Sequence, residues 1–168
     1  MGASYPRVRG QWRGLMADVR LIAIGQKMPD WVQIACTEYL ARFRRQFKLI
    51  LEEIPASKKA RTEAKEEHRK RTLDRLKPSD FLVLLDERGQ SYSTVELAEQ
   101  LTRWELTSRP LVFALGGADG WCEGMCERAD SQWSLSRLVF PHPLARIIVV
   151  EQLYRADSVR RGHPYHRS

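Results

Sequence analysis

The stretch Leu111-Val-Phe-Ala-Leu-Gly-Gly-Ala-Asp-Gly120 decides the fold. Its first half is a continuous apolar run of strand length, and Phe81-Leu-Val-Leu-Leu-Asp86 is a second run of the same kind. Strands that are apolar on both faces are typical of a parallel sheet that helices cover on each side. The glycines that follow Leu115 form either a simple turn of the chain or a turn whose backbone N–H groups approach a ligand.

Apolar strands alternate with helical patterns along the rest of the chain. We expect strands at 19–25, 47–54, 81–86, 111–115 and 133–139, and helices that begin near 31, 57, 93, 123 and 144. The capping-box pattern Ser93-x-x-Glu96 marks the start of the third helix. This alternation predicts an α/β fold with a mainly parallel sheet flanked by helices, in one domain over residues 19–168. Residues 1–18 are expected to be a disordered extension.

The composition is that of an ordinary globular protein with an excess of basic residues. Lys and Arg total 28 and Asp and Glu total 21 among 168 residues, which gives a net charge of +7. A basic balance favours polyanionic partners, with nucleic acid first among them. Every apolar run is shorter than the roughly 18 residues that a membrane span needs, so we expect no membrane partner.

The cysteines bear on the redox compartment of the protein and on a possible zinc site. Three cysteines are too few for a disulfide framework, so free thiols and a reducing cytoplasm are expected. Cys122 and Cys126 are four residues apart, whereas structural zinc sites prefer closer pairs. A zinc site that joins these thiols to His163 and His166 is therefore an alternative, and we expect no metal.

Residues 57–77 differ from the rest of the chain in charge. They contain nine Lys or Arg residues and four acidic residues, with almost no apolar side chain before Leu73. Mixed charges at three- and four-residue spacing favour a solvated surface helix. A dedicated RNA-binding face is the alternative.

A pocket is expected at one edge of the sheet, because ligands of open parallel sheets lie beyond the carboxyl ends of the strands. The loops after three of the expected strands would meet at that edge. They bring together Asp86, Gly116 and the segment 135–140. Trp133 precedes this segment, although a lone tryptophan is more often a core residue.

The last helix is apolar on nearly all sides. Its apolar residues are Leu144, Ile147, Ile148, Val149, Val150, Leu153 and Tyr154. A helix of this kind needs cover on several sides, and a second copy of the chain is the natural cover, so we expect a homodimer. Arg146, Glu151 and Arg155 are then expected near the subunit interface, where a buried charge is either paired or catalytic.

The end of the chain carries His163, Tyr165, His166 and Arg167. These residues supply a titratable base, an aromatic ring and a fixed cation, which suit contact with an RNA base and its phosphate. A frayed chain end is the alternative.

Several blocks of residues together carry a resemblance to a known family. They are Ile24-Gly25, Lys27-Met-Pro-Asp-Trp31, Glu38-Tyr39, Leu84-Leu-Asp-x-x-Gly89, Gly116-Gly-x-x-Gly120, Trp133-Ser-Leu-Ser136, Pro141-His-Pro-Leu144, Glu151-Gln-Leu-Tyr-Arg-Ala156 and Pro164-Tyr-His-Arg167. From Leu21 onward, the chain resembles the large-subunit ribosomal RNA pseudouridine N3-methyltransferases of the SPOUT (α/β-knot) superfamily.

The resemblance implies a deep trefoil knot in the C-terminal third, a homodimer, and S-adenosylmethionine as the methyl donor for a pseudouridine in ribosomal RNA. It assigns cofactor binding to Leu85, Gly116, Gly117, Leu135, Ser136, Arg137, Leu138, Val139 and Phe140. Backbone groups of such a loop can hold adenine and ribose, which fits the chemically plain residues found there.

The implied reaction also suggests roles for residues near the end of the chain. The ring nitrogen that accepts the methyl group carries a proton, so a base or a stabilising cation is needed. We expect His142 or His166 near this proton and Arg155 and Arg167 near the developing negative charge, with Tyr165 stacked on the base. His142 lies between two prolines and could equally brace a turn. In a dimer, the tail of one subunit is expected to complete the pocket of the other.

Two other functions remain open on the sequence. One is a SPOUT enzyme that methylates transfer RNA, and the other is a ribosome-associated RNA-binding factor without catalysis. An enzyme of this size is expected to recognise the assembled ribosome rather than naked RNA.

Overall fold

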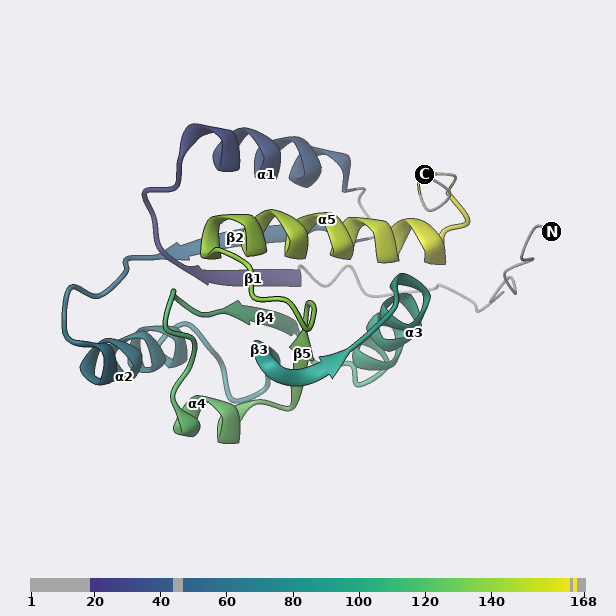
Figure 1. Ribbon diagram of the computed structural model, residues 1–168. Helices are drawn as coiled ribbons and strands as arrows, with labels where there is room; N and C mark the ends of the chain where they lie inside the picture. The colour runs from purple at the N-terminus through teal and green to yellow at the C-terminus, as the bar shows by residue number, and fades with distance from the viewer. Residues whose placement is uncertain (1–18, 44–46, 164, 166–168) are drawn as a thin grey trace.

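The computed structural model describes residues 19–43, 47–163 and 165, in which parallel strands form a single five-stranded sheet (Figure 1). The strands are β1 (Val19–Ile24), β2 (Leu49–Ile54), β3 (Phe81–Ser91), β4 (Leu111–Leu115) and β5 (Ser131–Ser134). Their order across the sheet is β2-β1-β4-β3-β5. The predicted α/β class and parallel sheet are confirmed, whereas the trefoil knot stays a prediction.

Helices cover both faces of the sheet. They are α1 (Asp30–Arg42), α2 (Arg61–Leu73), α3 (Thr94–Glu105), α4 (Glu123–Arg128) and α5 (His142–Arg160). In Figure 1, α1 and α5 lie side by side above the sheet, whereas α2 and α4 lie below it. The predicted capping box at the start of α3 is confirmed, because the Ser93 side chain accepts a hydrogen bond from the Glu96 N–H and the Glu96 side chain accepts one from the Ser93 N–H.

The core has two layers because successive strand residues point to opposite faces. Val83 and Leu85 of β3 pack in the layer that α1, α3 and α5 cover. Leu82 and Leu84 pack in the other layer, with residues of α4. Trp133 belongs to the first layer, so its interpretation as a core residue is confirmed.

The predicted end of β3 at Asp86 is wrong. The strand continues to Ser91 after a shift in its register with β5. Gly89 allows this continuation, because a Cβ at that position would come within 2.7 Å of the backbone of Gln132 and Trp133. A glycine just after an apolar run usually indicates a turn, but this glycine serves close contact between strands instead.

The predicted end of the last strand at Val139 is also wrong, because β5 ends at Ser134. The hydroxyl of Ser134 donates a hydrogen bond to the Ser136 carbonyl, and the Leu138 N–H donates to the Ser136 hydroxyl. These local bonds turn the chain out of the sheet and leave 135–140 as a loop.

The charged segment forms α2 on the surface of the molecule. Ala64, His68 and Thr72 recur every four residues and form its buried face. Arg71 and Glu67 form an ion pair at the same spacing on its half-buried side. The interpretation as a solvated surface helix therefore agrees with the structure.

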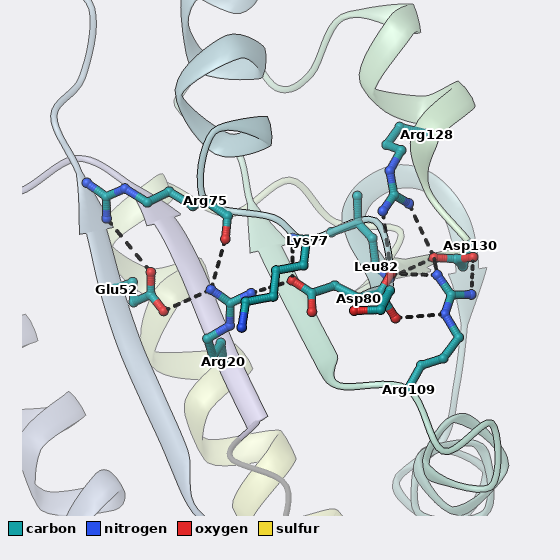
Figure 2. Close-up of polar contacts among 10 residues, drawn as sticks. Arg20, Glu52, Arg75, Lys77, Asp80, Leu82, Arg109, Arg128 and Asp130 are labelled. Atoms are coloured by element: carbon teal, nitrogen blue, oxygen red, sulfur yellow. Dashed lines mark hydrogen bonds and ion pairs between the residues drawn. The ribbon is translucent and has the colours of Figure 1, made fainter.

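A network of ion pairs ties together the amino ends of the strands (Figure 2). Asp80, just before β3, is paired with Arg20 of β1 at 2.5 Å and accepts the Lys77 N–H at 2.9 Å. Asp130, just before β5, is paired with Arg109 at 2.6 Å. This edge of the sheet is opposite to the edge at which the strands end.

Candidate functional site

A cavity of about 1350 Å³ opens at the carboxyl edge of the sheet, where the sequence predicts a pocket. Its walls come from the middle of β3 (85–88), the end of β4 with the loop after it (115–123), and the segment 133–142. Arg61 and Lys65 of α2 also line it. Because parallel strands end at a common edge, segments that are distant in the sequence meet here.

Every residue that the resemblance assigns to cofactor binding lines this cavity. These residues are Leu85, Gly116, Gly117, Leu135, Ser136, Arg137, Leu138, Val139 and Phe140. Asp86 lines it as well, as its position at the sheet edge predicts. The structure therefore brings the predicted group together, while its binding role stays a prediction.

The turn after β4 is packed so tightly that its backbone forms the wall of the cavity. A Cβ on Gly116 would lie 3.1 Å from Nε1 of the buried Trp121, and a Cβ on Gly117 would lie 3.2 Å from Cε1 of His68. Gly120 has a φ of +72°, and its N–H donates to the Gly117 carbonyl at 3.0 Å. Glycine is needed here for close approach and for the turn itself.

The loop 135–140 forms the facing wall and exposes apolar side chains. Leu138 is 72% exposed and Val139 is 84% exposed, while Phe140 packs against the core. Within the described residues, several N–H groups of this loop make no hydrogen bond to another backbone group: those of Ser136, Arg137, Val139 and Phe140. Such groups are available to a ligand in the cavity.

His142 begins α5 and lines the cavity. Burial lowers the pKa of its imidazole, the nearby Arg146 guanidinium lowers it further, and a backbone hydrogen bond with Ile24 acts in the opposite direction. The ring is therefore neutral at pH 7, which is the form that can accept a proton.

Arg155 and Tyr165 lie elsewhere. Arg155 is thirteen residues after His142 on α5, a distance of roughly 20 Å along a helix. Neither residue is part of the cavity wall formed by the described residues of one chain. His166 and Arg167, the other predicted catalytic residues, lie outside the described residues. Within one chain, the structure therefore does not bring His142 together with Arg155 and Tyr165.

Tyr165 is instead held against α1 and α5. Its hydroxyl donates to Glu151 at 3.2 Å and lies 3.4 Å from the Tyr39 hydroxyl. Its ring packs on Tyr154 at 4.8 Å and under the Arg155 guanidinium at 4.7 Å. Burial, followed by these hydrogen bonds and the Glu151 charge, raises the pKa of the phenol, so Tyr165 stays protonated.

Charged residues at the mouth of the cavity are paired with one another. Arg88 binds Asp86 at 2.9 Å and Glu123 at 3.2 Å, and it also donates to the Cys126 sulfur at 2.9 Å. Burial alone would raise the pKa of Asp86, but the hydrogen bonds from Arg88 outweigh it and lower this pKa. Asp86 is thus an ionised carboxylate and is unsuited to donate a proton.

The zinc alternative finds no support in the part of the chain that the structure describes. No three His, Cys, Asp or Glu side chains gather there in a way that could hold a metal ion. Cys126 is buried beside Arg88, and burial raises the pKa of its thiol. His166, the fourth member of the alternative, lies outside the described residues.

Sequence reasoning missed the contribution of α2 to the cavity. Arg61 pairs with Asp119 at 3.1 Å across the glycine turn, and Lys65 donates to the Trp121 carbonyl at 3.3 Å. His68 supports the same turn from behind. The signal that could have revealed this contribution is His68, the only histidine in the segment 57–77, which lies on the same helical face as Ala64.

The helices in the described part of the chain give no candidate membrane span, because none is both long enough and apolar enough.

Comparisons with known proteins indicate the family of the chain. A family described as predicted SPOUT methyltransferases matches residues 17–166. Proteins named ribosomal RNA large subunit methyltransferase H, from Methylobacillus flagellatus and Thioalkalivibrio sulfidiphilus, are 42% and 44% identical to the chain, covering 89% of it and 98% of each relative. The SpoU methyltransferase AviRb from Streptomyces viridochromogenes, solved with AdoMet, is 10% identical with a TM-score of 0.42, over 89% of this chain and 64% of that chain.

The family match and the two relatives extend over nearly all of the described residues, including the cavity walls. The chain therefore belongs to the SPOUT methyltransferase family, in which it groups with the ribosomal RNA large subunit methyltransferases H.

Proposed function

We propose that this protein transfers a methyl group from S-adenosylmethionine to N3 of a pseudouridine in large-subunit ribosomal RNA. The observation that carries the proposal is the cavity, in which a glycine turn and a loop with free backbone N–H groups face each other. The membership of the chain in a methyltransferase family supports the reaction type, and the names of its relatives support the ribosomal substrate.

The cavity fits S-adenosylmethionine in size and in chemistry. Small-molecule pockets have volumes of roughly 300–1000 Å³, so this cavity leaves room for a nucleobase beside the cofactor. The free N–H groups of the 135–140 loop suit the nitrogen and oxygen acceptors of adenosine. The tight glycine turn places the backbone of Gly116 in the cavity wall, where a ligand can contact it.

The residues of this chain would orient the acceptor base and handle its proton. S-adenosylmethionine supplies an electrophilic methyl group, so alignment of donor and acceptor provides much of the catalysis. The imide nitrogen of the base must lose its proton, and the neutral His142 on the cavity wall is suited to accept it. Arg155 and Arg167 would stabilise the negative charge of the base, and Tyr165 would stack on it.

We also propose that the protein acts as a homodimer through α1 and α5. Trp31 is 53% exposed, Ile34 is 68% exposed and Leu144 is half-exposed, and all three lie near the starts of these two helices. A second copy would cover this apolar surface. Because Arg155 and Tyr165 are far from the cavity of their own chain, a role in catalysis requires that they act in the partner's cavity.

The substrate is proposed to be the assembled ribosome in the cytoplasm. The net charge of +7 and the basic residues Arg61 and Lys65 at the cavity support an RNA partner. The free thiols suit a reducing compartment.

A methyl-transfer assay tests the proposal. Wild type, His142→Ala, His166→Ala and Arg167→Ala are incubated with labelled S-adenosylmethionine and with whole ribosomes, isolated large subunits, naked ribosomal RNA or transfer RNA. We expect wild type to label whole ribosomes, and the label to be recovered in N3-methylpseudouridine. Ribosomes that carry an unmodified uridine at the target position are the matched control and should remain unlabelled. Label in transfer RNA, or none in any substrate, would overturn the proposal.

A further inference from the structure

Arg146 is the largest fully buried side chain in the described part of the chain, with 1% of its surface exposed. Its guanidinium donates to the carbonyls of Ile24 at 3.0 Å and Gly25 at 2.7 Å, at the end of β1. It also forms an ion pair with Glu53 of β2. One side chain of α5 therefore joins the carboxyl ends of two strands.

This arrangement is costly for a purely structural contact. Burial of a charge carries a large desolvation penalty, and apolar residues of similar volume often stabilise a core equally well or better. The Nε atom of Arg146 is buried and finds no hydrogen-bond partner among the described residues. A buried polar group without a partner in the protein needs an explanation, which can be a catalytic role, strain, or a bound water or ion.

The remaining neighbour of the guanidinium supplies such an explanation. Nη2 of Arg146 lies 3.5 Å from Nε2 of His142, one turn earlier on α5. His142 lines the cavity, whereas Arg146 is shut off from it by burial. Arg146 therefore contacts the cavity wall through His142.

Gly25 lets these groups approach one another. It has a φ of +103°, and a Cβ there would lie 3.6 Å from both Nη2 of Arg146 and Nε2 of His142 and only 2.7 Å from Cε of Met28. The backbone at the end of β1 can thus lie directly against the arginine and histidine.

We propose that Arg146, held by Glu53 and the β1 carbonyls, is a positioning residue that fixes the orientation and the protonation state of His142 in the cavity wall. This inference rests on the proposed function for its catalytic consequence, but its physical content can be measured without catalysis. The charged or titratable groups that act on the imidazole are Arg146 on α5 and His68 on α2, and Glu53 on β2 is the ion-pair partner of Arg146. Cys36 of α1 faces Arg146 and Glu53 from the other side.

Two substitutions should shift His142 in opposite directions. Arg146→Met removes the cation and leaves the Glu53 carboxylate, so the pKa of His142 should rise. Glu53→Gln leaves the cation without its counter-charge, so the pKa of His142 should fall. A role in packing alone predicts no such pair of opposite shifts.

The test is a pH titration of the histidine ring nitrogens by NMR in the full chain, with His142 assigned by comparison with His142→Gln. We expect opposite pKa shifts in the two variants, together with a changed ratio of the ring tautomers in Arg146→Met. A His142 signal that does not change in either variant would overturn the inference. Should Arg146→Met fail to fold, Glu53→Gln decides alone, because an unchanged or raised pKa of His142 in it contradicts the inference.

Kinetics then separate this inference from the proposed function. If His142 is the base, kcat of Arg146→Met should fall about 10- to 100-fold while the affinity for S-adenosylmethionine changes less than about threefold. In each variant, the midpoint of the acid limb of the pH–rate profile should move in the same direction as the pKa of His142 measured by NMR. An NMR shift without movement of the acid limb would support the positioning role and overturn the assignment of His142 as the base.

Discussion

The imidazole of His68 lies against Gly117 so closely that a Cβ at position 117 would come within 3.2 Å of the ring. The Ser57 N–H donates to Nε2 of this histidine at 2.8 Å, so the ring has little freedom to retreat. Burial lowers the pKa of His68, which keeps its Nε2 available as an acceptor. The charged helix α2 thus sets the position of the glycine turn in the cavity wall through His68.

Gly117→Ala should therefore weaken binding of S-adenosylmethionine without unfolding the protein. The added methyl must displace His68 or the turn, and overpacking of this kind costs about 1–3 kcal/mol. We expect the Kd to rise at least about tenfold, which corresponds to roughly 1.4 kcal/mol. Isothermal titration calorimetry provides the measurement.

Gly124→Ala is the matched control for this experiment. Gly124 lies in α4, and a Cβ there would meet only Arg69, at an ordinary contact distance of 3.5 Å. Alanine also favours a helix over glycine, so this variant should keep its affinity and its thermal stability. Equal affinities of the Gly117 and Gly124 variants would show that the turn does not contact the cofactor.

Asp80→Asn should destabilise the fold while leaving the cavity intact. The Asp80 side chain is 1% exposed and faces Arg20 in the network at the amino ends of the strands (Figure 2). Removal of one partner from a buried ion pair costs about 3–5 kcal/mol, because the other charge stays buried and unpaired. Because Arg20 is partly exposed and keeps its ion pair with Glu52 at 3.3 Å, we expect a smaller cost here, about 1–3 kcal/mol in urea unfolding. Glu38→Gln, which removes an exposed ion pair with Arg42, should leave the free energy of unfolding unchanged.

Stability should depend on acid pH through Asp130. Burial alone would raise the pKa of this carboxyl, but hydrogen bonds from Arg109 and the Leu82 N–H outweigh it and lower the pKa. A lowered folded-state pKa means that the stabilisation is present above the unfolded value of about 3.9 and is lost as the pH falls through the folded value. The difference in unfolding free energy between wild type and Asp130→Asn should therefore shrink as the pH falls from about 6 to about 2.

Asp157 gives the opposite dependence and serves as the internal control. Burial raises its pKa, although Arg161 and Arg160 oppose this effect. The folded state then holds the proton more tightly than the unfolded state, so this group costs stability as the pH rises through the unfolded pKa. Relative to Asp157→Asn, wild type should lose stability between low and neutral pH. The same slope for both variants would contradict these assignments.

Mixed dimers should show whether the tail acts in the partner's cavity. Gly116→Val disrupts the glycine turn of the cavity wall, because even a Cβ would meet Trp121 at 3.1 Å, and Arg167→Ala alters the tail. Each variant alone should be inactive, but a mixed dimer has one intact cavity that faces one intact tail. After random exchange of subunits, about a quarter of the wild-type activity should return. No recovery, despite dimers seen by sedimentation, would indicate that each tail serves its own chain.

The strands and the sheet-edge cavity could be predicted because their signals are local and strong. Apolar runs such as Leu111–Leu115 are continuous, and the carboxyl edge of a parallel sheet is a general place for ligands. The cavity-lining group followed from the resemblance, since plain residues such as Leu135 and Val139 carry no chemical signal of their own.

The rest depended on contacts between distant parts of the chain. Gly89 reads as a turn residue, and only the adjacent backbone of β5 explains why β3 continues through it. Arg146 was expected near a subunit interface, whereas it is buried within its own chain by partners more than ninety residues away. The participation of α2 in the cavity depends on His68, whose neighbour Gly117 is likewise remote in the sequence.

The strand order has a consequence for synthesis of the protein. The wall segments 85–88 and 115–123 precede β5, which pairs only with β3, and the wall segment 133–142 begins within β5. A nascent chain that has emerged only as far as β4 consequently exposes an incomplete concavity at the rim of a four-stranded sheet. We therefore expect the small-molecule site to be completed only late in translation, once the segment 133–142 has been added.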